Sequence, residues 1–243
     1  MKITKNKLRE IIKESVEDGH KERLIDLFKN GGENLRQAIE LAGYLGMEDF
    51  LHRADLKKVK MAGFDLRNVN LSRADMSMAR LRGADLRGAN LSRTQLYRAD
   101  IVNADLTNAI TRQTFFRKAN LGGSNFTGAD MTKVNLDHTH MRGTNLTGAN
   151  LENASLHVVN FRDANLTGAN LKNCKAYMCD FRGANLTNVD LTGADLTRSF
   201  LNDVDLTGAI IKNTDLEEVF FDETTIWPEG FDPAHTFSDK IYQ

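Results

Sequence analysis

Large hydrophobic residues recur at every fifth position along most of this chain. In steps of five from position 51 to position 226, 34 of 36 residues are Leu, Ile, Met or Phe, and only Thr111 and Ala176 depart from the pattern. Two residues before each of these central positions stands a small residue, Ala, Val, Thr, Ser or Cys, in every case but Phe64. The sequence therefore predicts one uninterrupted repeat from 51 to 226.

A period of five fits neither an α-helix nor an ordinary β-strand, because neither returns a side chain to the same face at that interval. A chain that turns a corner after each pentamer points its large and small apolar residues inward and leaves the other three positions at the surface. Asp or Asn precedes the central residue at 23 of 35 positions, and these side chains suit corners because they bond to nearby backbone groups. Each pentamer is predicted to form one side of a solenoid.

Surface residues show how many sides make one coil. The tetrapeptide Asn145-Leu146-Thr147-Gly148 recurs twenty residues later as Asn165-Leu166-Thr167-Gly168, and related versions extend this series in both directions. Twenty residues correspond to four sides. The sequence predicts a mainly β, four-sided parallel solenoid of about nine coils, on the order of 40 Å long.

The pentamers Ala84-Asp85-Leu86-Arg87-Gly88 and Ala149-Asn150-Leu151-Glu152-Asn153 resemble the A(D/N)Lxx motif of the pentapeptide repeat family. The resemblance covers about seven tenths of the chain. It implies a right-handed quadrilateral β-helix. The best understood members of that family bind DNA gyrase or topoisomerase IV as surface mimics of DNA, whereas most others have no assigned role.

Both flanks lack the repeat. Residues 1–50 show helical periodicity and are predicted to form an α-helical N-terminal cap over the open edge of the solenoid, with a partner-binding domain as the alternative. Residues 51–226 form the solenoid in this division, and residues 227–243 form a C-terminal tail. The tail is predicted to cover the last coil, and a homodimer paired through it is the alternative.

The amino-acid composition indicates the cellular location. The 243 residues include 32 Lys and Arg, 33 Asp and Glu and two cysteines, without a long apolar run. We therefore expect no secretory signal, no membrane contact and a cytoplasmic location. Cys174 and Cys179 fall on small inward positions, which favours structural burial over metal or redox chemistry.

The sequence shows no phosphate-binding glycine loop, nucleophile elbow or zinc-ligand spacing. Asp137, His138 and His157 come closest to a metal-ligand cluster, with Asp137 and His157 expected to be neighbours one coil apart. A surface imidazole pair is favoured there over a metal site. We expect no catalytic residues, metal or cofactor, and hence no enzyme.

The four sides differ in their outward residues. We name them by their central residues: first (51, 71, 91), second (56, 76, 96), third (61, 81, 101) and fourth (66, 86, 106), each continuing in steps of twenty. The second side is the least regular, and its aromatic and basic residues are typical of interfaces. Its predicted partner-binding residues are Tyr97, Arg98, Arg117, Lys118, His138, His157, Tyr177 and Arg198. Phe200 and Phe220, twenty residues apart at Asp/Asn positions, are predicted to stack outside the core as an exposed aromatic patch unless the tail covers them.

Charge separates the candidate functions. Residues 51–200 carry a net charge of +8 and residues 201–226 a net charge of −6. A DNA mimic needs dense negative potential along its rod, so modulation of gyrase or topoisomerase IV is the disfavoured alternative, and direct nucleic-acid binding is a weak third choice. The sequence favours a non-enzymatic rigid scaffold for a protein partner whose identity it does not reveal.

Thr111 and Ala176 place small side chains where bulky ones are expected. Our hypothesis is that outward neighbours turn inward to fill these gaps, with or without a local bulge. The candidates are Ile110 or Phe115 beside Thr111, and Tyr177 or Met178 beside Ala176.

Overall fold

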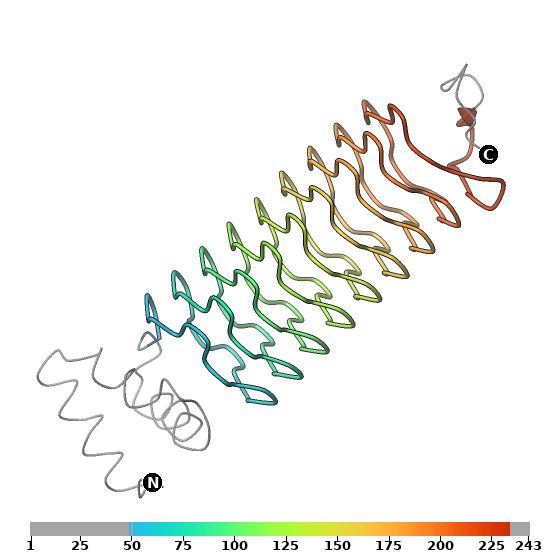
Figure 1. The fold of residues 1–243 in the computed structure, drawn as a ribbon. Helices are drawn as coiled ribbons and strands as arrows, with labels where there is room; N and C mark the ends of the chain where they lie inside the picture. The colour runs from blue at the N-terminus through green and yellow to red at the C-terminus, as the bar shows by residue number, and fades with distance from the viewer. Residues whose placement is uncertain (1–48, 50, 234–243) are drawn as a thin grey trace, which may run out of the picture.

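The computed structural model describes residue 49 and residues 51–233, which wind into a rod of stacked coils (Figure 1). The first described coils (blue) lie at one end of the rod and the last coils (red) at the other. The N-terminal helices predicted in residues 1–50 fall outside the described residues, apart from Asp49, as do residues 234–243 of the tail. The helical cap therefore stays a prediction.

Each side of the rod is a four-residue turn. In the first one the amide of Ala54 donates to the carbonyl oxygen of Leu51 over 3.1 Å. The third residue of the turn is left-handed in every side from 51 to 220, with φ between 54° and 70°. Glycine and asparagine tolerate this conformation best, which explains why they recur two residues after the central position. The predicted corner after each pentamer is confirmed.

Parallel bridges join each coil to the next. Asp55 pairs with Asp75, and the same offset of twenty residues continues along the rod to the pair of Phe200 and Phe220. The amide of Leu56 donates to the Asp75 carbonyl over 2.7 Å, and the Asp75 amide donates to Ala54 over 2.9 Å. Four sides per coil are thus confirmed, with eight coils from 51 to 210 and a ninth that begins at 211.

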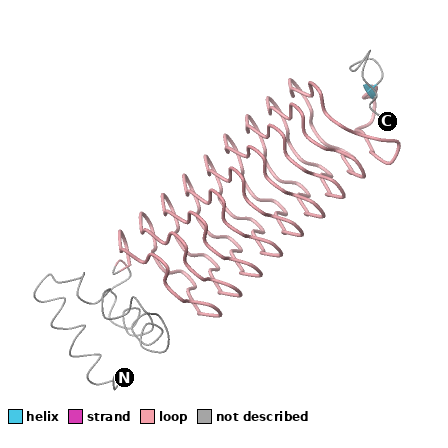
Figure 2. Ribbon diagram, viewed as in Figure 1, coloured by secondary structure: helices cyan, strands magenta, loops and turns pink. Residues whose placement is uncertain are grey.

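The bridges involve one residue per side, so the described residues contain no continuous β-strand (Figure 2). Pro233, the last residue of the described part, is the one helical position within it.

The core is a column of stacked central residues with small residues between them. Leu146, Leu166 and Leu186, in successive coils of the fourth side, are fully buried. Buried hydroxyl groups at small positions donate to the carbonyl of the central residue one coil earlier, as Thr94 does to Leu71 over 2.8 Å and Ser124 to Ile101 over 2.6 Å. Such pairing offsets the cost of placing hydroxyl groups in an apolar column.

The hypothesis about Thr111 and Ala176 is wrong. Ile110, Phe115 and Met178 remain exposed, and the twenty-residue bridge register passes both sites without a bulge. Bulky rings are buried in the same coils instead, and we infer that they take up the space. Two of them, Phe116 and Phe126, are fully buried in the coil of Thr111 with their ring centroids 6.3 Å apart.

Ala176 shares its coil with Phe181, which stacks on Phe161 of the preceding coil at 5.1 Å. We therefore infer that a small central residue is compensated by a larger central residue in the same coil, and that the outward residues beside Ala176 do not contribute to the core.

The prediction of an unbroken register up to 226 is wrong in the last side. Asp205 pairs with Ile226, an offset of 21 residues, so one residue is inserted after Phe221. Thr225 occupies the small inward position and is 9% exposed, whereas Ile226 faces outward and is 52% exposed. Asp222 stabilises the wider turn, because its carboxylate accepts hydrogen bonds from the amide and hydroxyl of Thr224.

Aromatic residues close the C-terminal end. Trp227 packs edge-on against Phe221 at 5.4 Å, and Phe231 lies 4.9 Å from Trp227. All three pack against the hydrophobic core. Trp227 and Phe231 of the tail thus lie against the core at this end, while capping by the whole tail and pairing of two rods through it stay predictions.

Candidate functional site

The fold brings all eight predicted contact residues to the second side of the rod. Backbone hydrogen bonds connect them from coil to coil, as from the amide of Arg98 to the carbonyl of Arg117 over 3.2 Å and from His138 to His157 over 2.9 Å. Because the second and third residues of each turn point away from the column, their side chains form two parallel rows along this side. The adjacency is a consequence of the coil length, and their role in binding stays a prediction.

A cluster of basic and aromatic residues lies on the second side across the coils of residues 91–110 and 111–130. We call it the basic-aromatic cluster; it comprises Tyr97, Arg98, Phe115, Arg117 and Lys118. The Arg98 guanidinium lies 5.3 Å from the centroid of the Tyr97 ring. Arg117 and Lys118 are exposed and form no ion pair with any described residue. Phe115 is 43% exposed at the adjoining corner.

Phe115 was not among the predicted contact residues. It occupies a position where Asp or Asn is usual, the same signal that singled out Phe200 and Phe220. Its neighbour Thr111 made an inward position for Phe115 the expected one instead. The sequence thus shows that Phe115 departs from the corner pattern. Whether its side chain points inward or outward depends on how the core of that coil packs.

The C-terminal half of the second side is internally bonded. Arg198 donates to Glu218 over 2.6 Å and to the Tyr177 hydroxyl over 3.0 Å. The hydrogen bond to Glu218 is the main cause that raises the pKa of Arg198 above its ordinary value. These side chains offer fewer free donors than the basic-aromatic cluster does.

Asp137 and His157 are neighbours, as predicted. The Asp137 carboxylate lies 3.3 Å from Nδ1 of His157 and accepts the Ser155 hydroxyl over 2.7 Å. Within residues 49 and 51–233, no group of three or more His, Cys, Asp or Glu side chains is placed to hold a metal ion. The same residues include no helix long and apolar enough to cross a membrane.

Cys174 and Cys179 are both buried and not joined by a disulfide, as their small inward positions predicted. Burial raises the pKa of the Cys174 thiol to about 12 and that of Cys179 well above its ordinary value. The Cys179 thiol also donates to the Leu156 carbonyl. Both groups are unreactive thiols at neutral pH rather than nucleophiles.

Cations on the third and fourth sides are mostly paired, in contrast to those of the cluster. The Arg67 guanidinium donates two hydrogen bonds to Asp65 and lowers the pKa of that carboxyl to about 2. Similar pairs occur along these sides and the corners that adjoin them: Arg87 with Asp85, Arg82 with Asp100, Arg142 with Asp163, and Arg182 with Asp180.

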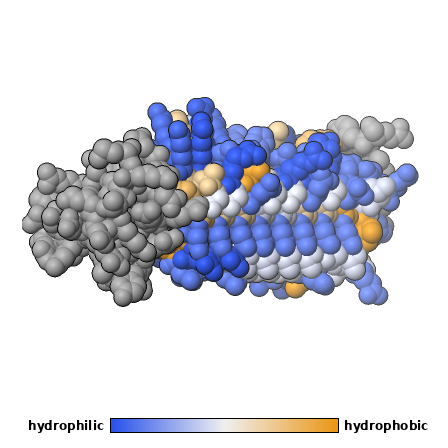
Figure 3. Space-filling view, turned by 90° about the horizontal axis from the view of Figure 1, so that it is seen from below, coloured by the Kyte–Doolittle hydropathy of each residue, from blue (hydrophilic) through white to orange (hydrophobic). Residues whose placement is uncertain are grey.

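The fourth side also carries a row of threonines, one per coil from Thr107 to Thr207. Most of their hydroxyl groups are bonded locally, as in Thr147, which donates to the Asn145 side chain over 2.6 Å. Figure 3 shows rows of hydrophilic residues that run along one face of the rod, with hydrophobic residues scattered between them.

Phe200 and Phe220 stack outside the core, as predicted, with ring centroids 4.8 Å apart and planes within 15°. Both rings are half-buried, and the Arg182 guanidinium lies 5.1 Å from the centroid of Phe200. The pair is therefore less exposed than the sequence suggested.

The repeated turns, the inward large and small residues and the twenty-residue coil define a four-sided β-solenoid. The family model for pentapeptide repeats matches the chain in eight copies, over residues 51–88, 79–113, 112–148, 144–183 and 184–222. The chain belongs to this family, whose fold is a right-handed quadrilateral β-helix.

Among solved structures, the chain is similar to HetL, a pentapeptide repeat protein involved in heterocyst differentiation regulation from the cyanobacterium Nostoc sp. strain PCC 7120. The two are 21% identical over 74% of this chain and 92% of HetL, with a TM-score of 0.46.

QnrB1, a plasmid-mediated fluoroquinolone resistance protein, is 17% identical over 71% of this chain and 84% of its own, with a TM-score of 0.43. Rfr23 from the cyanobacterium Cyanothece 51142 is 32% identical over 51% of this chain and 63% of its own, with a TM-score of 0.27. No curated protein matches the chain in sequence.

Proposed function

We propose that this pentapeptide repeat protein is a non-catalytic scaffold that binds a protein partner through the second side of its rod. The observation that carries the proposal is the basic-aromatic cluster. Arg117 and Lys118, which form no ion pair within the described part of the chain, lie beside the exposed Phe115 ring and the Tyr97–Arg98 pair. Cations on the third and fourth sides, in contrast, have carboxylate partners.

This combination suits a protein interface better than a solvated surface. Tyr and Arg are enriched among the residues that dominate binding energy, and exposed aromatic rings gain from desolvation on contact. Unpaired guanidinium and ammonium groups favour a partner segment that carries carboxylates. The partner surface we infer is therefore acidic, with an apolar residue placed to contact Phe115.

The rod supplies rigidity for this purpose. Each turn is fixed by hydrogen bonds to the coils on both sides, so residues from separate coils keep their spacing when the protein is free. A preorganised surface loses less conformational entropy on binding.

A Tyr97→Ala/Arg117→Glu double variant tests the proposal. Lysate capture with quantitative mass spectrometry identifies proteins retained by the wild type, and the affinity of the best candidate is then measured with purified components. We expect the double variant to weaken binding at least tenfold, because residues of this kind each contribute about 1 kcal/mol or more. Lys133→Glu, on the first side, is the matched charge-reversal control and should bind as the wild type does.

Equal affinity of the wild type and the double variant for that partner would refute the surface assignment. A variant that unfolds is recognised from its circular dichroism spectrum. In that case, Lys118→Glu alone, at an exposed position with no ion pair to lose, repeats the test.

The alternative is modulation of a type II topoisomerase by a DNA-like surface. The basic character of residues 51–200 counts against it, and the acidic side chains gather in the last coils, including Glu217, Glu218 and Asp222. A gyrase supercoiling assay titrated with purified protein separates the two functions. Inhibition, or protection from a quinolone, at micromolar protein or below would favour the alternative.

A further inference from the structure

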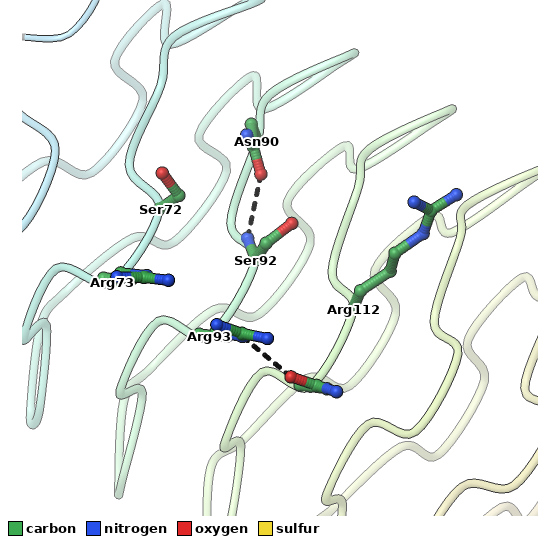
Figure 4. A pocket seen from close by; sticks show the side chains of 7 residues that line it. Ser72, Arg73, Asn90, Ser92, Arg93 and Arg112 are labelled. Atoms are coloured by element: carbon green, nitrogen blue, oxygen red, sulfur yellow. Dashed lines mark hydrogen bonds between the residues drawn. The ribbon is translucent and has the colours of Figure 1, made fainter.

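A hollow of about 340 Å³ opens on the first side of the rod, across the coils that begin at residues 71, 91 and 111 (Figure 4). It exists because Ser72 and Ser92 are short at positions where the next coil carries Arg112. It is lined by Ser72, Arg73, Asn90, Ser92, Arg93, Arg112 and Gln113.

Three arginines line this hollow, and only one of them has an anionic partner among the described residues. Arg73 forms no ion pair or side-chain hydrogen bond with any described residue. Arg93 donates through Nε to the neutral side chain of Gln113 over 2.8 Å. Arg112 alone is paired, with the Asp130 carboxylate. The lining residues themselves include no carboxylate, so the hollow has an excess of positive charge.

The fourth side shows how an arginine ladder is usually neutralised in this rod. There, Arg67 and Arg87 alternate with Asp65, Asp85 and Asp105, and each guanidinium approaches two carboxylates. The corner that precedes the first side instead presents neutral Asn90 at the corresponding position in the hollow.

Arg73 and Arg93 stand in successive coils, about 4.8 Å apart along the rod. Like charges at this spacing repel each other, and a bound anion relieves that repulsion.

We propose that this hollow binds a phosphate monoester dianion. The donors are the guanidinium groups of Arg73 and Arg93, whose planar forks match phosphate oxygens, together with the Ser92 hydroxyl. That hydroxyl forms no hydrogen bond with the described residues, whereas the Ser92 amide is already taken by Asn90 at 3.0 Å.

The size and lining of the hollow define the ligand class. Its volume is at the lower end of small-molecule sites. None of its lining residues is aromatic, so it offers no ring on which a nucleobase would stack. The phosphoryl group therefore comes from a small phosphate ester or from a phosphorylated side chain of a protein. The site lies on a different side of the rod from the basic-aromatic cluster and does not depend on the proposed function.

Binding is tested with the full-length protein by calorimetry and by thermal unfolding. The probes are inorganic phosphate, O-phosphoserine and a short phosphoserine peptide with its unphosphorylated twin, all measured against chloride at equal ionic strength. We expect phosphate or its esters to raise the melting temperature, and an Arg73→Gln/Arg93→Gln variant to lose at least tenfold in affinity. Glutamine is compatible with the left-handed backbone here, since Gln113 adopts φ 55° in the same row.

Lys133→Gln is the matched control. It removes a positive charge from the same row of the same side, also at left-handed φ, but outside the hollow. Its phosphate affinity should stay within twofold of the wild type. Binding of inorganic phosphate and O-phosphoserine supports a small ester as the source, and binding of the phosphopeptide alone supports a phosphorylated protein.

Three results would overturn the proposal. The first is the absence of any phosphate effect beyond that of chloride, and the second is an equal loss of affinity in Lys133→Gln. The third is tighter binding of single-stranded DNA than of phosphate, unaffected by Arg73→Gln/Arg93→Gln, because this would indicate diffuse attraction to a polyanion.

Discussion

Replacing Thr111 by leucine restores the consensus of the repeat and, according to the structure, destabilises the protein. Thr111 is fully buried at a central position, and almost all other central positions of the repeat hold Leu, Ile, Met or Phe. Repeat statistics alone favour Thr111→Leu as a stabilising change. The coil of Thr111, however, already holds the two buried rings of Phe116 and Phe126.

The expected magnitude follows from this packing. Leucine is longer than threonine by a methylene group, and the coils above and below fix the height available to it. Overpacking a filled core costs about 1–3 kcal/mol. For a chain of this length a loss of about 2 kcal/mol lowers the melting temperature by about 4–8 °C.

The hydroxyl group contributes little to this difference. Thr111 donates through its hydroxyl to the Asp130 carbonyl over 3.2 Å, but the same carbonyl also accepts the Thr111 amide at 2.7 Å and keeps a donor when the hydroxyl is removed. Thr111→Val, which removes the hydroxyl with almost no change in volume, is therefore the control and should change the melting temperature little.

Thermal unfolding of the two variants, together with Phe126→Leu and Thr111→Leu/Phe126→Leu, tests the reasoning. If the rings occupy the space beside Thr111, the loss of unfolding free energy in the double variant should be about 1 kcal/mol smaller than the summed losses of the two single variants. A Thr111→Leu protein that melts above the wild type, or strict additivity in the double variant, would refute the idea that volume is exchanged within a coil.

Three further outcomes are expected from the same structure. Cys174 and Cys179 should both resist a thiol reagent at pH 8 in the native protein and react together in denaturant; rapid labelling of the native state would contradict their burial. Because hydrogen bonding to Arg67 holds the pKa of Asp65 at about 2, below its unfolded value, this pair stabilises the fold above about pH 4, and the benefit is lost as the pH falls toward 2. Arg67→Gln should therefore lower the urea midpoint slightly at pH 7, as expected for an exposed pair, and most of this difference should disappear at pH 2. Trp227, the single tryptophan, packs against Phe221 at the C-terminal end of the described rod; its fluorescence should change at lower urea concentration than the circular dichroism signal, because end coils of a solenoid unfold first, and coincident midpoints would count against fraying of this end.

The local pattern of the sequence was sufficient for the architecture. A five-residue period with one large and one small apolar position permits few ways to bury both, and the twenty-residue recurrence of surface motifs set the number of sides. The same arithmetic placed Asp137 beside His157 and Phe200 beside Phe220, since residues one coil apart must be neighbours in a solenoid of constant register.

Features that depend on packing between sides were decided by the tertiary structure. The extra residue after Phe221 was hidden because Ile226 and Trp227 are both apolar, so the pattern continues in either register. The space beside Thr111 was filled by rings of the same coil, which left Phe115 exposed in the basic-aromatic cluster. Which cations remain unpaired also depended on side-chain positions across coils, because the 18-residue separation that joins Arg82 with Asp100 is not kept by every pair, and Arg142 instead reaches Asp163. A one-dimensional repeat determines which residues are neighbours, but only the three-dimensional packing determines how neighbours share volume and charge.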